Sequence, residues 1–245
     1  FSIAGYRRGF KDDRGNVFFE IIDVLEAQYE TYNKYPQAIM LENVKNLKGH
    51  DKGNTYKVIK EALEAHGYYV KEAVLNSMDY GNVPQNRERI YIVGFQSLEQ
   101  LKKFEFPDPI LLEKNLNRVI DRTEKVDEAF YYTEDSQYYK MLRENMKSHD
   151  TVYQLRRIYV RENKSNVCPT LTANMGTGGH NVPLILDNYN NIRKLTPDEC
   201  LKLQGFPDTF KFPDKMANSH KYKQAGNSVT VPVIRRIAKN LIKVL

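Results

Sequence analysis

The spacing of apolar residues in the first hundred positions alternates between two periods. Apolar side chains recur every three or four positions over residues 17–29 and 58–63, which predicts two helices, the second ending at Gly67. Short apolar runs rich in β-branched and aromatic residues predict three strands, over residues 38–41, 69–75 and 90–95. Helix, strand, helix, strand is the order of a doubly wound sheet, so this part of the chain is predicted to be α/β.

The connection between the last two predicted strands determines how they pair. It runs from Asp79 to Arg89, which we take as too short to hold a helix. Strands joined so closely pair antiparallel, because a parallel pair needs a crossover of about a dozen residues or more. The first hundred residues are thus predicted to form one half of a doubly wound sheet.

The composition changes beyond Pro107. Residues 111–150 are acidic and rich in tyrosine, with weak periodicity. Residues 151–187 instead carry a basic cluster followed by a glycine-rich run, namely Arg156, Arg157, Arg161 and Lys164, then Asn174 to Gly179. This shift predicts a second domain.

A third pattern begins at Arg193. The run Thr196-Pro-Asp-Glu199 is a capping box with proline at the first helical position, which predicts a helix that ends near Gly205. After Pro232, apolar residues recur along one stripe and basic residues lie elsewhere. That pattern predicts an amphipathic helix at the end of the chain.

Composition and charge exclude several classes of protein. No stretch reaches the roughly 18 uninterrupted apolar residues of a membrane span and no signal segment opens the chain, so a cytoplasmic location is the default. The net charge of +6 permits a polyanionic partner. The five histidines lack ligand spacing, so no metal site is expected. Cys168 and Cys200 fit reduced thiols better than a disulfide framework, although two thiols also allow one bridge.

Three short segments carry residue types suited to chemistry. Glu42-Asn-Val44 follows an apolar strand, where doubly wound sheets place ligands, although a glutamate there is more often a solvated loop residue or helix cap. In Gln85-Asn-Arg-Glu-Arg89, two arginines at alternating positions project to the same face and suit a pyrimidine carbonyl or phosphate oxygens, unless they belong to a charged edge strand. Gly226-Asn-Ser-Val229 precedes a predicted helix and can hold a carboxylate, or form only a turn and a helix cap.

Six segments follow one another along the chain: FSIAGYRRGFKDDRGNVFFEI, MLENVKNL, LNSMDYGNVPQNRERIYIVGF, VCPTLTANMGTGGHNVPLI, RKLTPDECLKLQGFPDTF and QAGNSVTVPV. In this order they resemble the bacterial C5-cytosine DNA methyltransferases of restriction–modification systems, over the whole chain except residues 101–150, which vary in that family. The resemblance implies the distal half of a class I S-adenosylmethionine-dependent methyltransferase sheet, which is Rossmann-like. It also implies a smaller, mixed, mainly β target-recognition domain.

The resemblance implies a division of the chain and an activity. Residues 1–100 are expected to form the distal half of the catalytic domain, and residues 101–190 the target-recognition domain. Residues 191–245 are expected to form a small-domain segment and a C-terminal helix that returns to the catalytic domain. The implied activity is methyl transfer from S-adenosylmethionine to carbon 5 of a flipped cytosine in a specific double-stranded DNA sequence.

The chemistry of the family explains why these residue types are needed. A cysteine thiolate adds to C6 of cytosine, and the enamine takes the methyl group from S-adenosylmethionine before a base removes the C5 proton. By resemblance, Glu42 bonds the N3 and N4 edge of the base and supplies a proton at N3, so burial is expected to raise the pKa of its carboxyl toward neutrality. Arg89, with Arg87 beside it, is expected to polarise O2 and hold the base.

The resemblance assigns further contacts to cofactor and DNA. Val17 is expected near the cofactor adenine, and Asn227 with Ser228 at its methionine carboxylate. A loop at residues 2–14 is expected to close over the DNA. The residues expected to contact DNA are Ser2, Arg7, Arg14, Gln85, Arg156, Arg157, Thr170, Thr172, Asn174, Gly178 and His180. Arginines among them suit phosphates, whereas residues 170–180 suit base edges.

The chain departs from the family at its start. Family members carry Pro-Cys-Gln one residue ahead of the position that matches Phe1, and a glycine-rich cofactor loop further upstream. Neither Cys168 nor Cys200 replaces that nucleophile, so we expect this polypeptide not to methylate DNA unaided. The upstream part is expected in a longer polypeptide or as a separate N-terminal subunit of a split enzyme. The first is favoured, because a separate subunit needs its own start methionine.

Two functions from different classes fit the motifs. The first is a DNA (cytosine-5-)-methyltransferase, with a cognate restriction endonuclease as partner in the same system. The second is a catalytically inert, sequence-specific DNA-binding relative. Intact Glu42, Arg89 and Asn227 favour the enzyme, since a binding protein does not need a methyl-transfer pocket.

Overall fold

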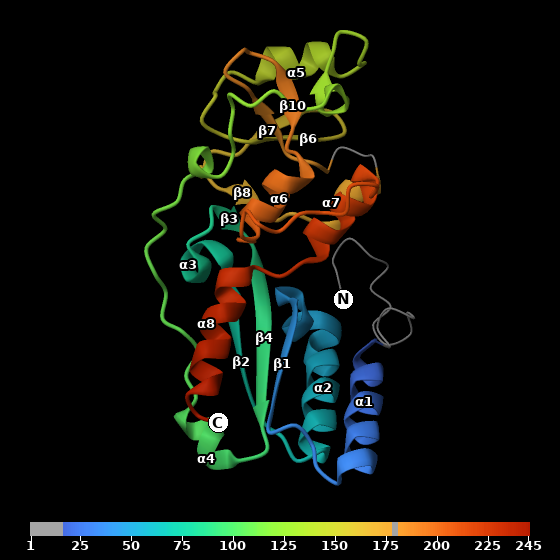
Figure 1. Cartoon of the computed structure of the whole chain (residues 1–245), viewed down its shortest axis with the longest axis vertical. Helices are drawn as coiled ribbons and strands as arrows, with labels where there is room; N and C mark the ends of the chain where they lie inside the picture. The colour runs from blue at the N-terminus through green and yellow to red at the C-terminus, as the bar shows by residue number, and fades with distance from the viewer. Residues whose placement is uncertain (1–16, 178–180) are drawn as a thin grey trace. The chain divides into compact units, whose positions relative to one another are not determined.

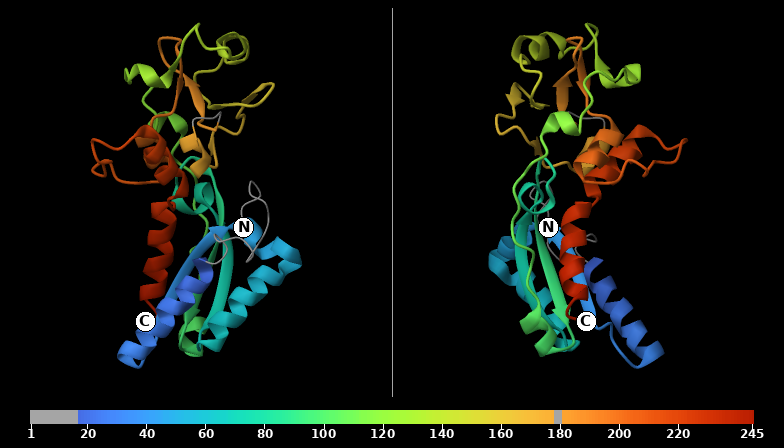
Figure 2. Two further views of the ribbon diagram at one scale, coloured as in Figure 1. Left: turned by 90° about the vertical axis from the view of Figure 1, so that its right-hand side faces the viewer. Right: turned by 60° about the vertical axis from the view of Figure 1, so that its left-hand side comes forward.

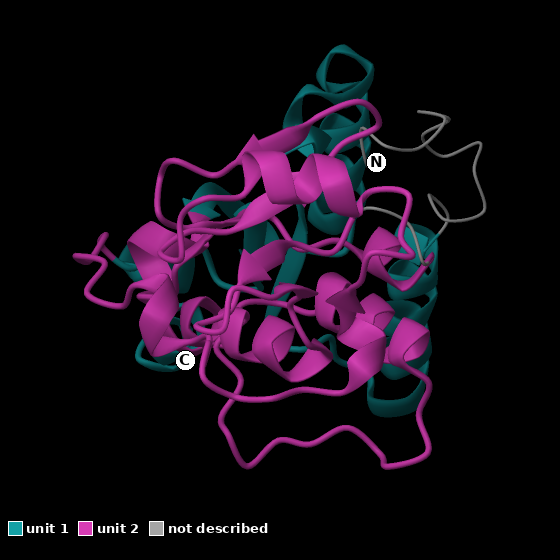
Figure 3. Cartoon of the chain, turned by 90° about the horizontal axis from the view of Figure 1, so that it is seen from above, with its two compact units in different colours: residues 1–75, 88–107, 237–245 teal, residues 76–87, 108–236 magenta. Residues whose placement is uncertain are grey.

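The computed structural model describes residues 17–177 and 181–245, which form two units (Figure 3). Unit 1 comprises residues 17–75, 88–107 and 237–245 of the described chain, and unit 2 comprises residues 76–87 and 108–236. Each unit is therefore assembled from stretches that are far apart in the sequence. The three contiguous segments expected from the sequence stay a prediction.

Unit 1 is built on a three-stranded sheet in the order β1-β4-β2 (Figure 1). Its strands are β1 (Ala38–Val44), β2 (Tyr69–Asn76) and β4 (Glu88–Phe95). β4 is central, and its apolar run from Ile90 to Phe95 is buried, as expected for a continuous apolar strand. It pairs antiparallel with β1, from Ala38 opposite Phe95 to Val44 opposite Arg89. The predicted strands are confirmed, and β2 and β4 are neighbours.

The two predicted helices of unit 1 are confirmed as α1 (Val17–Tyr32) and α2 (Asn54–Ala65). They form one core cluster with the sheet, which includes Phe18, Ile22, Leu25, Ile59, Leu63, Ile90 and Ile92. Gly67 has a φ of 79°, so it supplies the left-handed residue that follows the end of α2. Unit 1 also contains the 3₁₀ segment η2 (Lys45–Gly53) and α4 (Leu98–Lys103).

The link between β2 and β4 holds a short helix, which the sequence analysis excluded wrongly. α3 (Ser77–Gly81) is a five-residue turn, followed by the short strand β3 (Gln85–Asn86). The Asn76 side chain caps α3 by accepting from the Met78 N–H at 3.4 Å. A helix this short needs no apolar periodicity, so the hydrophobic pattern could not show it.

Unit 2 contains a five-stranded sheet of short strands in the order β5-β10-β9-β6-β7. Its strands are β5 (Tyr131–Tyr132), β6 (Tyr153–Leu155), β7 (Val160–Glu162), β9 (Leu184–Leu186) and β10 (Ile192–Lys194). A second sheet pairs β3 in parallel with β8 (Cys168–Pro169). Figure 1 and Figure 2 show how short these strands are beside the long strands of unit 1. The chain is mixed α/β, as predicted.

Short helices complete unit 2: α5 (Tyr139–Asn145), α6 (Pro197–Leu203), α7 (Asn218–Asn227), and the 3₁₀ turns η3 (Leu116–Arg118), η4 (Glu128–Phe130) and η5 (Ala173–Thr177). The capping box of α6 is confirmed, because the Thr196 hydroxyl accepts from the Glu199 N–H at 3.2 Å and the Glu199 carboxylate accepts from the Thr196 N–H at 2.7 Å. Gly205, with φ 76°, follows this helix as predicted.

The predicted terminal helix is confirmed as α8 (Val231–Ile242). The chain passes from unit 2 into unit 1 within it, between Arg236 and Ile237. Within residues 17–177 and 181–245, none of the helices is both long enough and apolar enough to cross a membrane.

Candidate active site

Glu42 and Arg89 form an ion pair across strands β1 and β4 of unit 1. The register places Glu42 opposite Tyr91 and Arg89 opposite Val44, so both side chains lie on the same face of the sheet. Arg89 Nε lies 3.1 Å from Glu42 Oε1, and Arg89 Nη1 donates to the Glu88 carbonyl at 2.8 Å. The Arg89 and Glu42 side chains keep 13% and 23% of their surface exposed, so a partner can still reach both.

Burial and pairing act on Arg89 in opposite directions. Burial lowers the pKa of the guanidinium, and the Glu42 carboxylate raises it by a smaller amount, so the pKa lies below its usual value. An arginine remains charged in proteins even so. The pair therefore presents a positive donor beside a carboxylate acceptor, an arrangement that can bond a planar ring edge carrying both donors and acceptors.

A cavity of about 380 Å³ opens beside Glu42 in unit 1. Its lining is mostly apolar and comes from α1, α2, the sheet and η2, and it includes Val17, Phe18, Ile21, Leu41, Leu47, Ile59 and Ile92. Glu42 and Asn43 supply the polar part of the lining. Val17, which the sequence assigns to the cofactor, thus lies on the same cavity as Glu42. An apolar slot with few polar groups suits a flat, largely apolar ring.

Arg87 belongs to unit 2, where its guanidinium is buried among main-chain carbonyls. It donates to the carbonyl oxygens of Leu171 at 2.8 Å, Ser228 at 2.6 Å and Gly226 at 3.3 Å, and it is 2% exposed. The strand is interrupted at Arg87, between β3 and β4, so the common face predicted for Arg87 and Arg89 is not formed. Because both Nη atoms already donate to carbonyls, these contacts favour a structural role for Arg87 over contact with a base.

The sequence analysis predicted DNA contact for Gln85, and the structure contradicts it. Gln85 is 0% exposed. Its amide nitrogen donates to the Leu203 carbonyl at 2.8 Å and to Gln204 Oε1 at 3.2 Å, and its oxygen accepts from the Leu171 N–H at 3.1 Å. A side chain enclosed and bonded in this way has no surface left for DNA.

Asn227 is the last residue of α7 and Ser228 is its C-cap, and three residues separate α7 from α8. The sequence did not indicate α7, because only Tyr222, Ala225 and Gly226 are buried in a run that is otherwise polar, so the stripe is too short to stand out. Asn227 is exposed. The Ser228 hydroxyl donates to the Ala225 carbonyl at 2.8 Å, so it caps the end of α7. Of the two, Asn227 has the more available donor.

Residues 168–177 contain the segment that the sequence assigns to base reading. Thr172 and Asn174 are exposed and thus accessible to a partner. The Thr170 hydroxyl donates to the Asn86 carbonyl at 2.7 Å, which favours a structural role for that side chain. Five other residues assigned to DNA lie outside the described residues, namely Ser2, Arg7, Arg14, Gly178 and His180.

The hairpin of β6 and β7 carries basic and apolar residues at its tip. Arg157 is exposed, while Arg156 is half-buried and donates to Gln154 Oε1 at 3.0 Å. Next to them, Ile158 is 83% and Tyr159 54% exposed. Sequence reasoning missed these two residues, because apolar residues near strands usually belong to a core. The sequence does show an apolar pair within a run of arginines. Exposed apolar residues of this kind are typical of an interaction surface.

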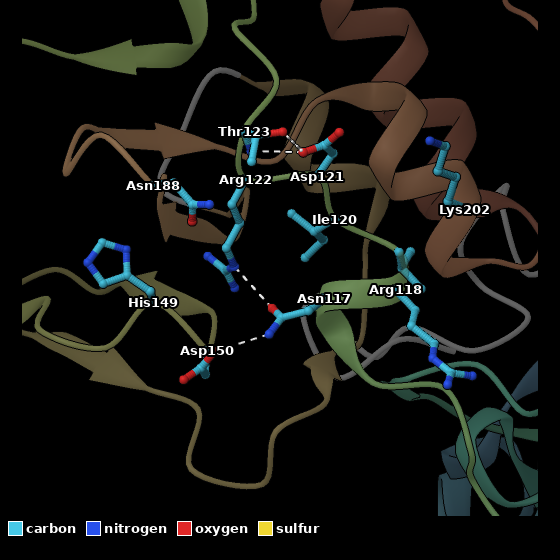
Figure 4. Close-up of a pocket in the computed structure, with 11 residues that line it drawn as sticks. Asn117, Arg118, Ile120, Asp121, Arg122, Thr123, His149, Asp150, Asn188 and Lys202 are labelled. Carbon is cyan, nitrogen blue, oxygen red and sulfur yellow. Dashed lines mark hydrogen bonds between the residues drawn. The ribbon is translucent and has the colours of Figure 1, made fainter.

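A second cavity, of about 480 Å³, lies in unit 2 around Arg122 (Figure 4). Its lining carries charges of both signs, from Arg118, Asp121, Asp150 and Lys202. Arg122 is 6% exposed and donates to the carbonyls of Leu186 at 2.8 Å and Thr151 at 2.9 Å, and to Asn117 Oδ1 at 3.2 Å. The buried arginine of this cavity therefore serves the fold.

Cys168 and Cys200 are free and buried in one core cluster of unit 2. Burial raises the pKa of both thiols, so neither forms a thiolate readily. Burial therefore makes both thiols poorly suited to act as a nucleophile, and the upstream cysteine stays a prediction.

A family model for C-5 cytosine-specific DNA methylases matches residues 1–243 of the chain. The chain is 59% identical to the Type II methyltransferase M.Bsp6I of Bacillus sp. (strain RFL6), over 99% of this chain and 75% of that protein. It is 42% identical to the Type II methyltransferase M.HaeII of Haemophilus aegyptius, over 100% of this chain and 71% of that protein.

Two solved structures share the fold of the chain. The Entamoeba histolytica methyltransferase EhMeth has a TM-score of 0.67 and 21% identity, over 97% of this chain and 71% of that chain. A variant of Spodoptera frugiperda DNMT2 has a TM-score of 0.66 and 21% identity, over 99% of this chain and 76% of that chain. At this level of identity the likeness shows the fold alone.

Proposed function

Because the chain belongs to the family of C-5 cytosine-specific DNA methylases, we propose that its Glu42–Arg89 pair activates a cytosine flipped out of double-stranded DNA. The activity of the family is methylation of cytosine in DNA at carbon 5. One observation carries the proposal: a partly exposed carboxylate and guanidinium share one face of a sheet beside an apolar cavity.

The two side chains match the polar edge of cytosine. Arg89 can donate to O2, and Glu42 can accept from the N4 amino group and, when protonated, donate to N3. A proton at N3 draws electrons from the ring and opens C6 to a nucleophile. Without a base, the Glu42 carboxylate lies 3.1 Å from Arg89 Nε. The proposed role of Glu42 requires it to carry a proton when the base is bound.

S-adenosylmethionine supplies the methyl group in this reaction, and each unit by itself carries residues assigned to it. In unit 1, the apolar cavity beside Glu42 suits an adenine ring, with Val17 on its lining. In unit 2, the exposed Asn227 amide can donate to a carboxylate. The Ser228 hydroxyl is bonded to Ala225, so we assign it the weaker contact.

The DNA-contacting surface of unit 2 is assigned to two exposed features. Arg157 and Arg161 on the β6–β7 hairpin can neutralise phosphates, with exposed Ile158 and Tyr159 between them for apolar contact with bases. Thr172 and Asn174 carry exposed hydrogen-bonding groups that can read base edges. The first feature contributes affinity, and the second contributes sequence specificity.

The relatives place the chain in a restriction–modification context. M.Bsp6I and M.HaeII are both Type II methyltransferases. We propose that methylation by this protein protects its target sequence from a cognate restriction endonuclease.

The proposal is tested with Glu42→Gln in the full-length protein. Glutamine keeps the shape of the side chain but cannot deliver a proton, so methyl transfer should fall by about 10²-fold or more while duplex affinity stays nearly unchanged. The measurements are incorporation of labelled methyl groups into a duplex and a DNA-binding titration.

Glu88→Gln is the matched control. Glu88 lies on the same strand, one residue from Arg89, and pairs with Lys45 at the surface. Its replacement should leave methyl transfer within about twofold, because a surface ion pair contributes little. Wild-type turnover in Glu42→Gln would remove Glu42 from the mechanism.

A further inference from the structure

Residues 85–87 hold the main chain of the recognition segment, which we define as residues 168–177. β3 pairs in parallel with β8 at the start of this segment, with Gln85 opposite Cys168. Gln85 Oε1 accepts from the Leu171 N–H at 3.1 Å, and Arg87 Nη1 donates to the Leu171 carbonyl at 2.8 Å. Both main-chain polar groups of Leu171 are thus bonded by side chains of one short run.

Arg87 also binds the end of α7. Its Nη2 donates to the carbonyls of Ser228 at 2.6 Å and Gly226 at 3.3 Å. Hydrogen bonds from a charged guanidinium are stronger than those between neutral groups. One buried side chain therefore joins the 85–87 run, the recognition segment and the α7 terminus.

The recognition segment and α7 also touch through their main chains. A Cβ atom at Gly226 would overlap the Thr172 carbonyl group, and a Cβ atom at Gly176 would overlap the Ser219 carbonyl oxygen. Contact this close leaves the segment little room to move without changing its bonds to Arg87.

Arg87 stands two residues before Arg89, and the chain passes from unit 2 into unit 1 between Arg87 and Glu88. Residues 85–89 thus carry first Arg87, which bonds the recognition segment, and then Arg89, which pairs with Glu42. We infer that Arg87 is a positioning residue that makes cytosine activation by the Glu42–Arg89 pair depend on correct seating of the recognition segment on DNA. The inference rests on the proposed function. It means that a wrong sequence is rejected at the methyl-transfer step, and not by weaker binding alone.

The test compares Arg87→Met with wild type in the full-length protein. The target is first identified by sequencing the methylated products of a random duplex library, and kcat and KM are then measured on the target and on duplexes with one base pair changed. Methionine fills the space but cannot bond three carbonyls. The ratio of kcat on the target to kcat on a changed duplex should fall by about tenfold, while KM stays nearly unchanged. A tenfold loss is a large part of the discrimination that one mismatched base pair normally provides.

Arg122→Met is the matched control. Arg122 is also a buried arginine of unit 2 whose two Nη atoms donate to main-chain carbonyls, but those belong to Leu186 and Thr151, outside the recognition segment. Its replacement should lower the melting temperature about as much as Arg87→Met, yet leave the kcat ratio within about twofold of wild type. Equal ratios in the two variants would overturn the inference, because Arg87 would then act only through stability.

Two milder variants keep the test decisive if Arg87→Met does not fold. Arg87→Lys retains a charge but lacks the planar fork, so its kcat ratio should fall between those of wild type and methionine. Thr170→Val removes the hydroxyl bond to the Asn86 carbonyl and should lower the ratio in the same direction by a smaller factor. Unchanged discrimination in both variants would overturn the inference. A wild-type protein that methylates no duplex would instead refute the proposed function.

Discussion

Each unit contains an arginine–glutamate pair, and the two pairs differ in how fully their atoms are bonded. In unit 2, Arg193 meets Glu199 through two contacts of 2.8 Å, and the side chains are 0% and 6% exposed. In unit 1, Arg89 Nε meets Glu42 at 3.1 Å, and both side chains remain accessible. The same two residue types thus form one closed pair and one open pair.

The surroundings explain the difference between the pairs. Arg193 also donates to the Asp121 carbonyl, and Glu199 closes the capping box of α6, so the unit 2 pair is part of the fold. Burial acts to lower the pKa of Arg193, but its hydrogen bonds to Glu199 prevail and raise it, whereas the pKa of Arg89 is lowered by burial. The open pair is accessible, and its two side chains stabilise each other less than those of the closed pair. This is expected of a site that must bind a further group.

Breaking the closed pair should produce the largest loss of stability. Arg193→Met leaves Glu199 buried without its partner, which should cost about 3–5 kcal/mol of unfolding free energy in urea titrations of the full-length protein. Arg89→Met, at the open pair, is the comparison and should cost less, because the Glu42 side chain stays partly in contact with solvent. Equal losses would mean that both pairs are structural.

The fold follows from the sequence where apolar periodicity is strong. The helices α1 and α2, the three strands of unit 1, α8 and the capping box of α6 all show clear patterns of apolar spacing or end signals. α3 and α7 do not, because α3 is one turn long and α7 buries only a few residues of a polar run. Sequence order also could not show that residues 76–87 belong with residues 108–236.

The site was only partly predictable, for a related reason. Glu42 and Arg89, which the sequence assigns to one base, lie on neighbouring regular strands and form an ion pair that the sequence did not indicate. Gln85 and Arg87 belong to an irregular link, and their partners at Leu171 and Ser228 are far away in sequence. A polar run does not reveal which of its side chains point into the protein. The sequence therefore could not show that Gln85 and Arg87 are buried in unit 2.

Replacement of Asn227, which is assigned to the cofactor, should have an effect of intermediate size. Asn227→Ala should weaken S-adenosylmethionine binding by about tenfold, because a carboxylate loses a donor, while Ser228→Ala should have a smaller effect. Isothermal titration calorimetry with the full-length protein measures both. Duplex affinity without cofactor is the control and should not change. Unchanged cofactor affinity in Asn227→Ala would refute the assignment.

The smallest effect is expected at the β6–β7 hairpin. Arg157→Ala should weaken binding to all duplexes alike and reduce the slope of log affinity against log salt by about one. Lys57→Ala on α2 is the control, because Lys57 is also an exposed cation and pairs with Glu61 in unit 1. A change in target preference, or an equal change of slope in both variants, would contradict the phosphate-contact role of Arg157.

We propose that the open pair is catalytic, whereas the closed pair is structural. One measurement tests it directly: the single-turnover methyl-transfer rate and the unfolding free energy of Glu42→Gln and Glu199→Gln, determined on the same full-length preparations. Glu42→Gln should lower the rate by about 10²-fold or more and the stability by less than about 1 kcal/mol. Glu199→Gln should lower the stability by about 3 kcal/mol or more and leave the rate of the folded protein within about threefold. Comparable losses of rate and stability in the two variants would contradict a catalytic role for the open pair and a structural role for the closed pair.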